Sequence, residues 1–80
     1  MFGFTDEELI NFHNKISDNV KMYRKQQGLN QLDISIELGF NNSSFISHAE
    51  NHRLKTHYYS IEHLYKISKI LNIDICKLIS

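Results

Sequence analysis

The residues best suited to recognition chemistry lie together in the middle of the chain. Gly39 should end one helix, because glycine adopts a positive φ at little steric cost, and Asn42 is a good N-cap for a second helix. At 3.6 residues per turn, the apolar side of that second helix holds Phe45, Ile46 and Ala49. Its other side is short, polar and almost uncharged, and holds Ser43, Ser44, Ser47, His48 and Asn51.

This polar side favours close approach to another molecule, because a solvated helix face usually carries Lys and Glu. Hydroxyl, imidazole and amide groups can reach base edges in the major groove of DNA. The alternative is a surface helix that is merely rich in serine, and the helix alone does not decide between the two.

The charge distribution bears on this choice. The formal net charge is zero, whereas Lys and Arg contacts to phosphates supply most non-specific affinity for nucleic acid. The placement of charges matters more than their sum. Between His48 and His57 the chain carries Arg53 and Lys55, with Glu50 as the only acid, while three acids cluster at residues 6–8. We expect a neutral but polarised chain.

Length and composition limit the class of protein. Eighty residues, 41% of them hydrophobic, predict one globular domain near the lower size limit for an independent core. No apolar run approaches the roughly 18 residues that a membrane span needs, and no secretory signal is visible. The single Cys76 excludes an internal disulfide and fits a reducing cytosol. We therefore expect a cytoplasmic protein without a membrane partner.

Helix signals run through the whole chain. Thr5 and Glu8 form a capping box at the start of the first helix, and Gly28 is its stop. The pattern leaves open one helix over 6–27 or two with a bend near Asn14. Ser60 caps a later helix that ends at Asn72; its expected apolar residues are Ile61, Leu64, Ile67 and Leu71. Asp74 caps a last short helix, so the fold class expected is all-α, with five helices in one compact unit.

The second expected helix, over 31–38, raises a question of its own. Ile34 and Leu38 should be buried, but Leu32 and Ile36 lie on a different face. In the favoured interpretation, residues 2–12 fold back over these two side chains. In the alternative, they form an exposed patch that meets a partner.

Five segments follow the order and spacing of a known family. They are Tyr23–Gln31, Leu38-Gly39, Phe45-Ile46-Ser47, Glu50-Asn51 and Ile61–Leu71. In these segments the chain resembles the lambda-repressor-like (Cro/Xre) family of helix-turn-helix DNA-binding domains. The resemblance covers 16–79, a repressor-like core, and leaves 1–15 as an N-terminal extension of helix 1.

The resemblance implies roles for particular residues. The helix after Asn42 would be the recognition helix in the major groove. Base contacts would come from Ser43, Ser44, Ser47 and His48. Phosphate contacts would come from Gln31, Asn42, Asn51, His52, Arg53 and Lys55. Arg24 and Glu50 would form a structural ion pair. The loop over 51–59 is longer than is usual in the family, and the short hydroxyls at the base-facing positions predict permissive readout.

The function expected is a sequence-specific, double-stranded DNA-binding transcriptional regulator, most simply a repressor. A domain this small should bind a palindromic site as a homodimer. By resemblance the dimer interface would involve Tyr65, Ile75, Cys76 and Ile79. Such proteins are phage repressors, restriction–modification controllers or antitoxins. The alternative is a protein-interaction module, such as an antitoxin that binds a cognate toxin, with weak DNA affinity.

Other chemistry finds less support in the sequence. His48, His52 and His57 invite a metal interpretation, but no carboxylate or thiol accompanies them in suitable spacing. Cys76 with His63 suggests a nucleophile and base, yet nothing supplies an oxyanion hole. Tyr58-Tyr59 could stack on single-stranded bases or pack between helices. We expect no enzyme activity, no metal and no cofactor.

Overall fold

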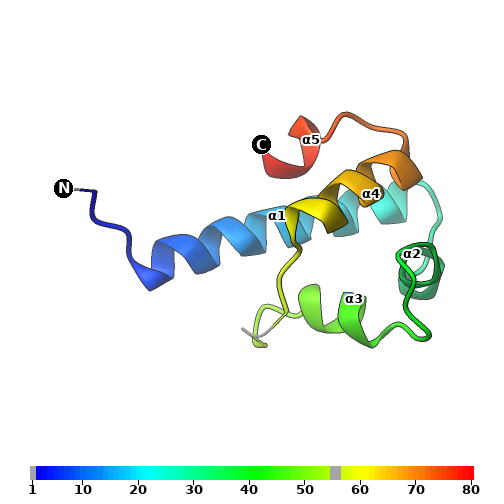
Figure 1. Ribbon diagram of the computed structural model, residues 1–80, viewed down its shortest axis with the longest axis horizontal. Helices are drawn as coiled ribbons and strands as arrows, with labels where there is room; N and C mark the ends of the chain where they lie inside the picture. The colour runs from blue at the N-terminus through cyan, green and yellow to red at the C-terminus, as the bar shows by residue number, and fades with distance from the viewer. Residues whose placement is uncertain (1, 55–56) are drawn as a thin grey trace.

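The computed structural model describes residues 2–54 and 57–80, and this part of the chain forms five helices without a strand. The helices are α1 (Asp6–Gln26), α2 (Gln31–Glu37), α3 (Ser44–Ala49), α4 (Ile61–Leu71) and α5 (Cys76–Ile79). The prediction of a compact all-α domain is confirmed. The principal extents of 41 × 25 × 20 Å are unequal because the first half of α1 extends past the other helices (Figure 1).

The helix ends follow local signals in the sequence. At the start of α1 the Thr5 hydroxyl accepts the Glu8 N–H, and the Glu8 carboxylate accepts the Thr5 N–H. α1 then runs unbroken to Gln26, so the alternative of two helices is excluded. After α1 and α2 the chain turns at Gly28 and Gly39, whose φ values are 72° and 92°. Asn72 ends α4 in the same left-handed region, with φ 54°.

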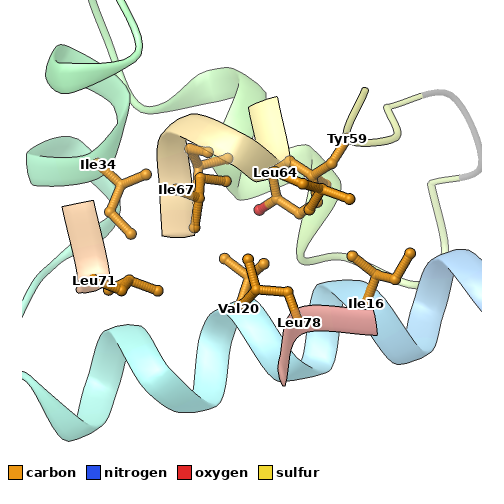
Figure 2. Packing of buried hydrophobic residues seen from close by; sticks show 10 residues of the cluster. Ile16, Val20, Ile34, Tyr59, Leu64, Ile67, Leu71 and Leu78 are labelled. Atoms are coloured by element: carbon orange, nitrogen blue, oxygen red, sulfur yellow. The ribbon is translucent and has the colours of Figure 1, made fainter. Parts of the chain in front are cut away.

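One hydrophobic core joins all five helices. Figure 2 shows Ile16 and Val20 of α1 facing the apolar side of α4 and the end of α5. The buried hydrophobic residues are Ile16, Val20, Ile34, Ile46, Ala49, Tyr59, Leu64, Ile67, Leu71 and Leu78. Burying an aliphatic side chain of this size contributes roughly 1.5–3 kcal/mol, so this cluster is the main source of stability. Leu38 and Phe45 pack against it from its edge.

Two hydrogen bonds from Asn19 of α1 hold the last helix. The Asn19 side-chain amide donates to the carbonyls of Leu78 and Ser80, at 2.9 and 3.1 Å. A four-residue helix leaves its carbonyls without intrahelical partners, so Asn19 satisfies groups that α5 cannot satisfy itself. Nearby, the Asp74 side chain accepts the Cys76 N–H at 2.9 Å, and this bond lowers the pKa of Asp74.

Two predictions about apolar residues are wrong. Residues 2–12 do not fold back over Leu32 and Ile36, which remain exposed. The unbroken α1 carries its N-terminal half away from α2 instead (Figure 1). Ile61 is also exposed rather than part of the apolar face of α4. It occupies the first turn of α4, where side chains lean toward the N-terminus and past the end of the core.

No helix in the described part of the chain combines the length and apolar character needed to cross a bilayer.

Candidate nucleic-acid interface

A buried ion pair connects α1 to the end of α3. The Arg24 guanidinium donates from Nε and from Nη2 to the two carboxylate oxygens of Glu50, both at 2.9 Å. Only 7% and 3% of the two side chains are exposed. The two parallel bonds form the bidentate geometry that makes Arg–carboxylate pairs strong. The ion pair expected from the resemblance is therefore present.

Gln31 and Leu29 complete this network. The Gln31 side-chain amide donates to Glu50 Oε1 at 3.0 Å, and Arg24 Nη1 donates to the Leu29 carbonyl at 2.9 Å. The carboxylate thus accepts three bonds, from two helices, at the point where α3 ends. Gln31, predicted as a phosphate contact, also holds α2 against α3. The arrangement fixes the orientation of α3 relative to α1 and α2.

A shallow polar hollow opens above this network. Its volume is about 540 Å³, and it is lined by Gln31 of α2 and by Ser43, the residue before α3, together with Asn30, Leu32 and the Arg24–Glu50 pair. Lys21 and Lys25 line it from α1, and neither lysine forms an ion pair within the described residues. Two unpaired cations beside serine and amide groups suit a phosphate group. A predicted base contact and a predicted phosphate contact therefore share one surface with two lysines.

The two lysines were not among the sequence-predicted site residues. The apolar spacing predicted the helix itself, and Lys21 and Lys25 are not part of that spacing. A signal was available: Lys21 and Lys25 flank Arg24 on the helix, at −3 and +1. Since the resemblance sets Arg24 against Glu50, helical spacing places Lys21 on the same side of the helix, whereas Lys25 is about 100° around it and its position beside the pair comes from the structure.

The polar side of α3 agrees with the expected helical wheel, although the helix begins one residue later. α3 starts at Ser44, and Ser43 occupies the N-cap position without a side-chain cap bond. The Asn42 side chain instead accepts the Ser44 N–H at 2.9 Å, within the turn. Asn42 is therefore not the N-cap. Ser44 is exposed, Ser43 and Ser47 are half-buried, and Ile46 and Ala49 are buried.

His48 differs from the serines in its surroundings. Its Nδ1 atom is buried and has no hydrogen-bond partner among the described residues. Its ring contacts that of His57, with centroids 4.7 Å apart. His57 and His63 in turn contact Phe45, at 5.5 and 5.0 Å. His48 thus stands at the border between the polar side of α3 and an aromatic cluster, and only part of its ring faces outward.

The loop after α3 packs onto α1. His52 Nε2 lies 2.8 Å from Asp18 Oδ1, so this predicted phosphate contact already has a carboxylate partner. The Asn51 side chain accepts the Arg53 N–H at 3.0 Å and shapes the loop. Arg53 is exposed. Lys55, the other predicted basic contact of the loop, lies outside the described residues.

The adjacent tyrosines of the loop have different environments. Tyr58 stacks on His13 of α1, with ring centroids 4.0 Å apart. Tyr59 belongs to the core, and burial raises its pKa well above the usual range. A buried Tyr59 cannot stack on bases, so the single-strand alternative loses one of its two aromatic groups.

The residues predicted for a dimer interface differ in exposure. Tyr65 is exposed, with Lys69 Nζ 5.4 Å from its ring centroid. Ile79 and Cys76 are exposed on α5. Ile75 is half-buried and packs against the core, so little of it is accessible to a second copy.

The described residues give little support to a metal site or to Cys76 as a nucleophile. No three His, Cys, Asp or Glu side chains in this part of the chain gather in a way that could hold a metal ion. The neighbouring Asp74 carboxylate raises the pKa of Cys76, which disfavours the reactive thiolate. His63 Nδ1 accepts the Ser60 N–H at the start of α4, and is therefore used as a helix cap.

The fold and this surface define a small all-helical domain with a polar, lysine-flanked helix. No protein-family model, curated protein or solved structure matches the chain.

Proposed function

We propose that the chain is a lambda-repressor-like, sequence-specific DNA-binding regulator that acts as a homodimer on a palindromic site. In this proposal α3 enters the major groove, with Ser43, Ser44, Ser47 and His48 facing base edges. Phosphates bind at the hollow beside it, between Gln31 and the two lysines of α1. The regulator is a repressor in the simplest case.

The observation that carries the proposal is the Arg24–Glu50–Gln31 network. It joins three helices beneath one surface and holds the polar side of α3 next to the hollow lined by Lys21 and Lys25. A base-reading helix has to be rigidly placed relative to its phosphate contacts. The charge distribution also supports the proposal, because Figure 1 places the acidic first turn of α1 at the far end of the molecule from α2.

The primary test is a selection of bound sequences from random duplex DNA at two salt concentrations. We expect a palindrome whose half-sites lie about one helical turn apart, with affinity that falls steeply as salt rises. No enriched sequence at low salt would contradict the proposal.

Single substitutions separate phosphate contacts from base contacts. Lys21→Ala, Lys25→Ala and Arg53→Ala should each weaken binding to all sequences and reduce the salt slope by about one unit. Ser44→Ala should change the preference between sequences at a nearly constant slope. Lys77→Ala is the control for charge, because α5 lies across α1 and α4 from α3 in Figure 1. If Lys77→Ala weakened binding as much as Lys25→Ala, the hollow would not be the phosphate site.

A second candidate function is a protein-interaction module such as an antitoxin. One specific observation favours it: an open groove of about 520 Å³ between α2 and α4, lined by Leu29, Ile36 and Ile70 together with Asp33 and Glu37. Ile36→Ser would then abolish capture of the partner protein and leave DNA affinity unchanged. Under the leading proposal the same substitution changes neither DNA affinity nor sequence preference.

A further inference from the structure

The N-terminal half of α1 has an exposed apolar side that no other helix covers. Residues 2–15, here called the arm, carry four large exposed side chains, and Figure 1 shows this part of the chain extending past the other helices. The exposed fractions are 85% for Phe2, 73% for Phe4, 49% for Leu9 and 48% for Phe12. Single exposed apolar residues are common on protein surfaces, but three exposed phenylalanines lie together at one end of this chain. Apolar patches of this kind mark docking sites.

Two opposite charges flank this side of the arm. Glu8 lies four residues before Phe12, and Lys15 lies three residues after it. At 3.6 residues per turn all three share one side of the helix. Glu8 and Lys15 are exposed, and neither forms an ion pair with another described residue.

Another side of the arm contacts the loop after α3. His13 stacks on Tyr58 there, and a small hollow lined by Asp6, Leu9, Ile10, His13 and Tyr58 lies along the same side, so Leu9 borders both this side and that of Phe12. The side over Phe12, between Glu8 and Lys15, is the exposed apolar side that a partner can approach.

We propose that this side of the arm binds the same side of a second copy of the chain, with the two arms antiparallel. A two-fold axis beside Phe12 sets Glu8 of each copy opposite Lys15 of the other, and the two Phe12 rings meet between these pairs. The charge pattern is self-complementary only in this antiparallel arrangement. A parallel pair would set Glu8 against Glu8 and Lys15 against Lys15.

The same register reaches α5. At 1.5 Å per residue, it brings Asp6, the first residue of α1, level with Ser17 of the other copy, and the non-helical Phe4 would lie just beyond, toward Asn19. Asn19 is the residue that holds the end of α5, where Ile79 is 41% exposed. Phe4 of one copy would therefore pack beside Ile79 of the second.

The area required for a stable dimer also favours the arm. A large aromatic side chain buries roughly 150–250 Å²; because Leu9 and Phe12 are already about half covered, the four apolar residues of the arm could bury at most about 500 Å² more per copy. Two copies then bury about 1,000 Å², close to the lower limit for a specific interface. The four-residue α5, with Ile79 as its exposed apolar residue, is too small to reach that limit alone.

The inference deepens the proposed function and rests on its homodimer, because it names the surface through which two copies meet. Its test uses no DNA, so the two proposals can fail separately. Self-association of the full chain is measured by sedimentation equilibrium, from micromolar to submillimolar concentrations. The expected result is a monomer–dimer equilibrium that Phe12→Ser shifts to monomer.

Charge reversal provides the more specific test of the antiparallel arrangement. Glu8→Lys and Lys15→Glu should each weaken self-association about tenfold, because two attractive pairs become repulsive. An equimolar mixture of the two variants should form a heterodimer as stable as the wild-type dimer, since one copy then presents two lysines to the two glutamates of the other. Glu8→Lys also removes the Thr5–Glu8 capping box. That loss would persist in the mixture, so it cannot explain a recovery of dimer formation there. Lys66→Glu, at an exposed position of α4, is the matched control and should change nothing.

Three outcomes would overturn the inference. The wild-type chain could remain monomeric over the whole concentration range. Its dimer could be insensitive to Phe12→Ser, which would place the interface elsewhere. The mixture of charge variants could stay monomeric, which would exclude the antiparallel register.

Discussion

The two halves of α1 differ although they belong to one unbroken helix. Residues 16–24 supply Ile16, Ser17, Val20 and Arg24 to the interior, whereas the arm exposes Leu9 and Phe12. Leu9, Phe12, Ile16 and Val20 recur at a single helical spacing. Periodicity therefore identifies a face of the helix, but the elements packed on that face decide how much of it is buried. In α1 that cover is supplied by α4 and α5, and it reaches only the second half.

The largest expected effect lies in the covered half. Arg24→Met should reduce stability by about 3–5 kcal/mol, because it leaves the Glu50 carboxylate buried without its cation. That loss is comparable to the whole stability of many domains of this size. Urea unfolding followed by circular dichroism measures it. Lys25→Met, the exposed neighbour, is the control, and an equal loss there would contradict the role of the ion pair.

A core substitution in the same half should cost somewhat less. Ile16→Ala removes a side chain that is 4% exposed, and we expect a loss of about 2–4 kcal/mol from lost transfer energy and the cavity left behind. The midpoint of chemical unfolding reports this change. If Ile16→Ala lowered the free energy of unfolding by less than Phe12→Ala does, Ile16 would not be in the core and the two halves of α1 would not differ in packing.

The buried Tyr59 predicts a dependence on alkaline pH. Burial raises its pKa in the folded chain, so its contribution to stability is complete below the unfolded value near pH 10 and is lost as pH rises further. The loss should approach about 1.4 kcal/mol per pH unit. Comparing Tyr59→Phe with the wild type isolates this contribution. Parallel alkaline stability curves for the two proteins would show that Tyr59 ionises freely when folded.

The smallest effect is expected in the arm. Phe12→Ala should change the stability of the monomer by less than about 1 kcal/mol, since exposed positions away from special features are nearly neutral. Thermal unfolding at low protein concentration, where the monomer dominates, is the appropriate measurement. A loss of several kcal/mol would indicate that the arm packs against its own chain after all.

The features that sequence alone predicted depend on neighbouring residues. The start of α1 is determined by the local hydrogen bonds between Thr5 and Glu8. Three later helix ends are determined by residues that adopt a positive φ, namely Gly28, Gly39 and Asn72. The apolar side of α3 followed from periodicity in the same way. The Arg24–Glu50 pair spans 26 residues, and only the family resemblance indicated it.

The features that sequence did not predict depend on contacts between distant residues. The stacking of His13 on Tyr58 and the approach of His52 to Asp18 have no local signature. They determine where the loop after α3 lies, and so which predicted phosphate contacts remain accessible. The exposure of Ile61 has a similar origin, because its spacing matches that of Leu64 and Ile67 but no element covers it.

The continuity of α1 has a geometric consequence for any assembly of two copies. A helix without a break fixes the rotational phase between its ends. One residue inserted after Lys15 would turn Phe12 by about 100° around the axis relative to Val20, and four would nearly restore its direction at a greater separation. If arms pair, α1 also sets the distance and twist between the two α3 helices. The length of α1 would then determine how far apart the two α3 helices lie in the pair.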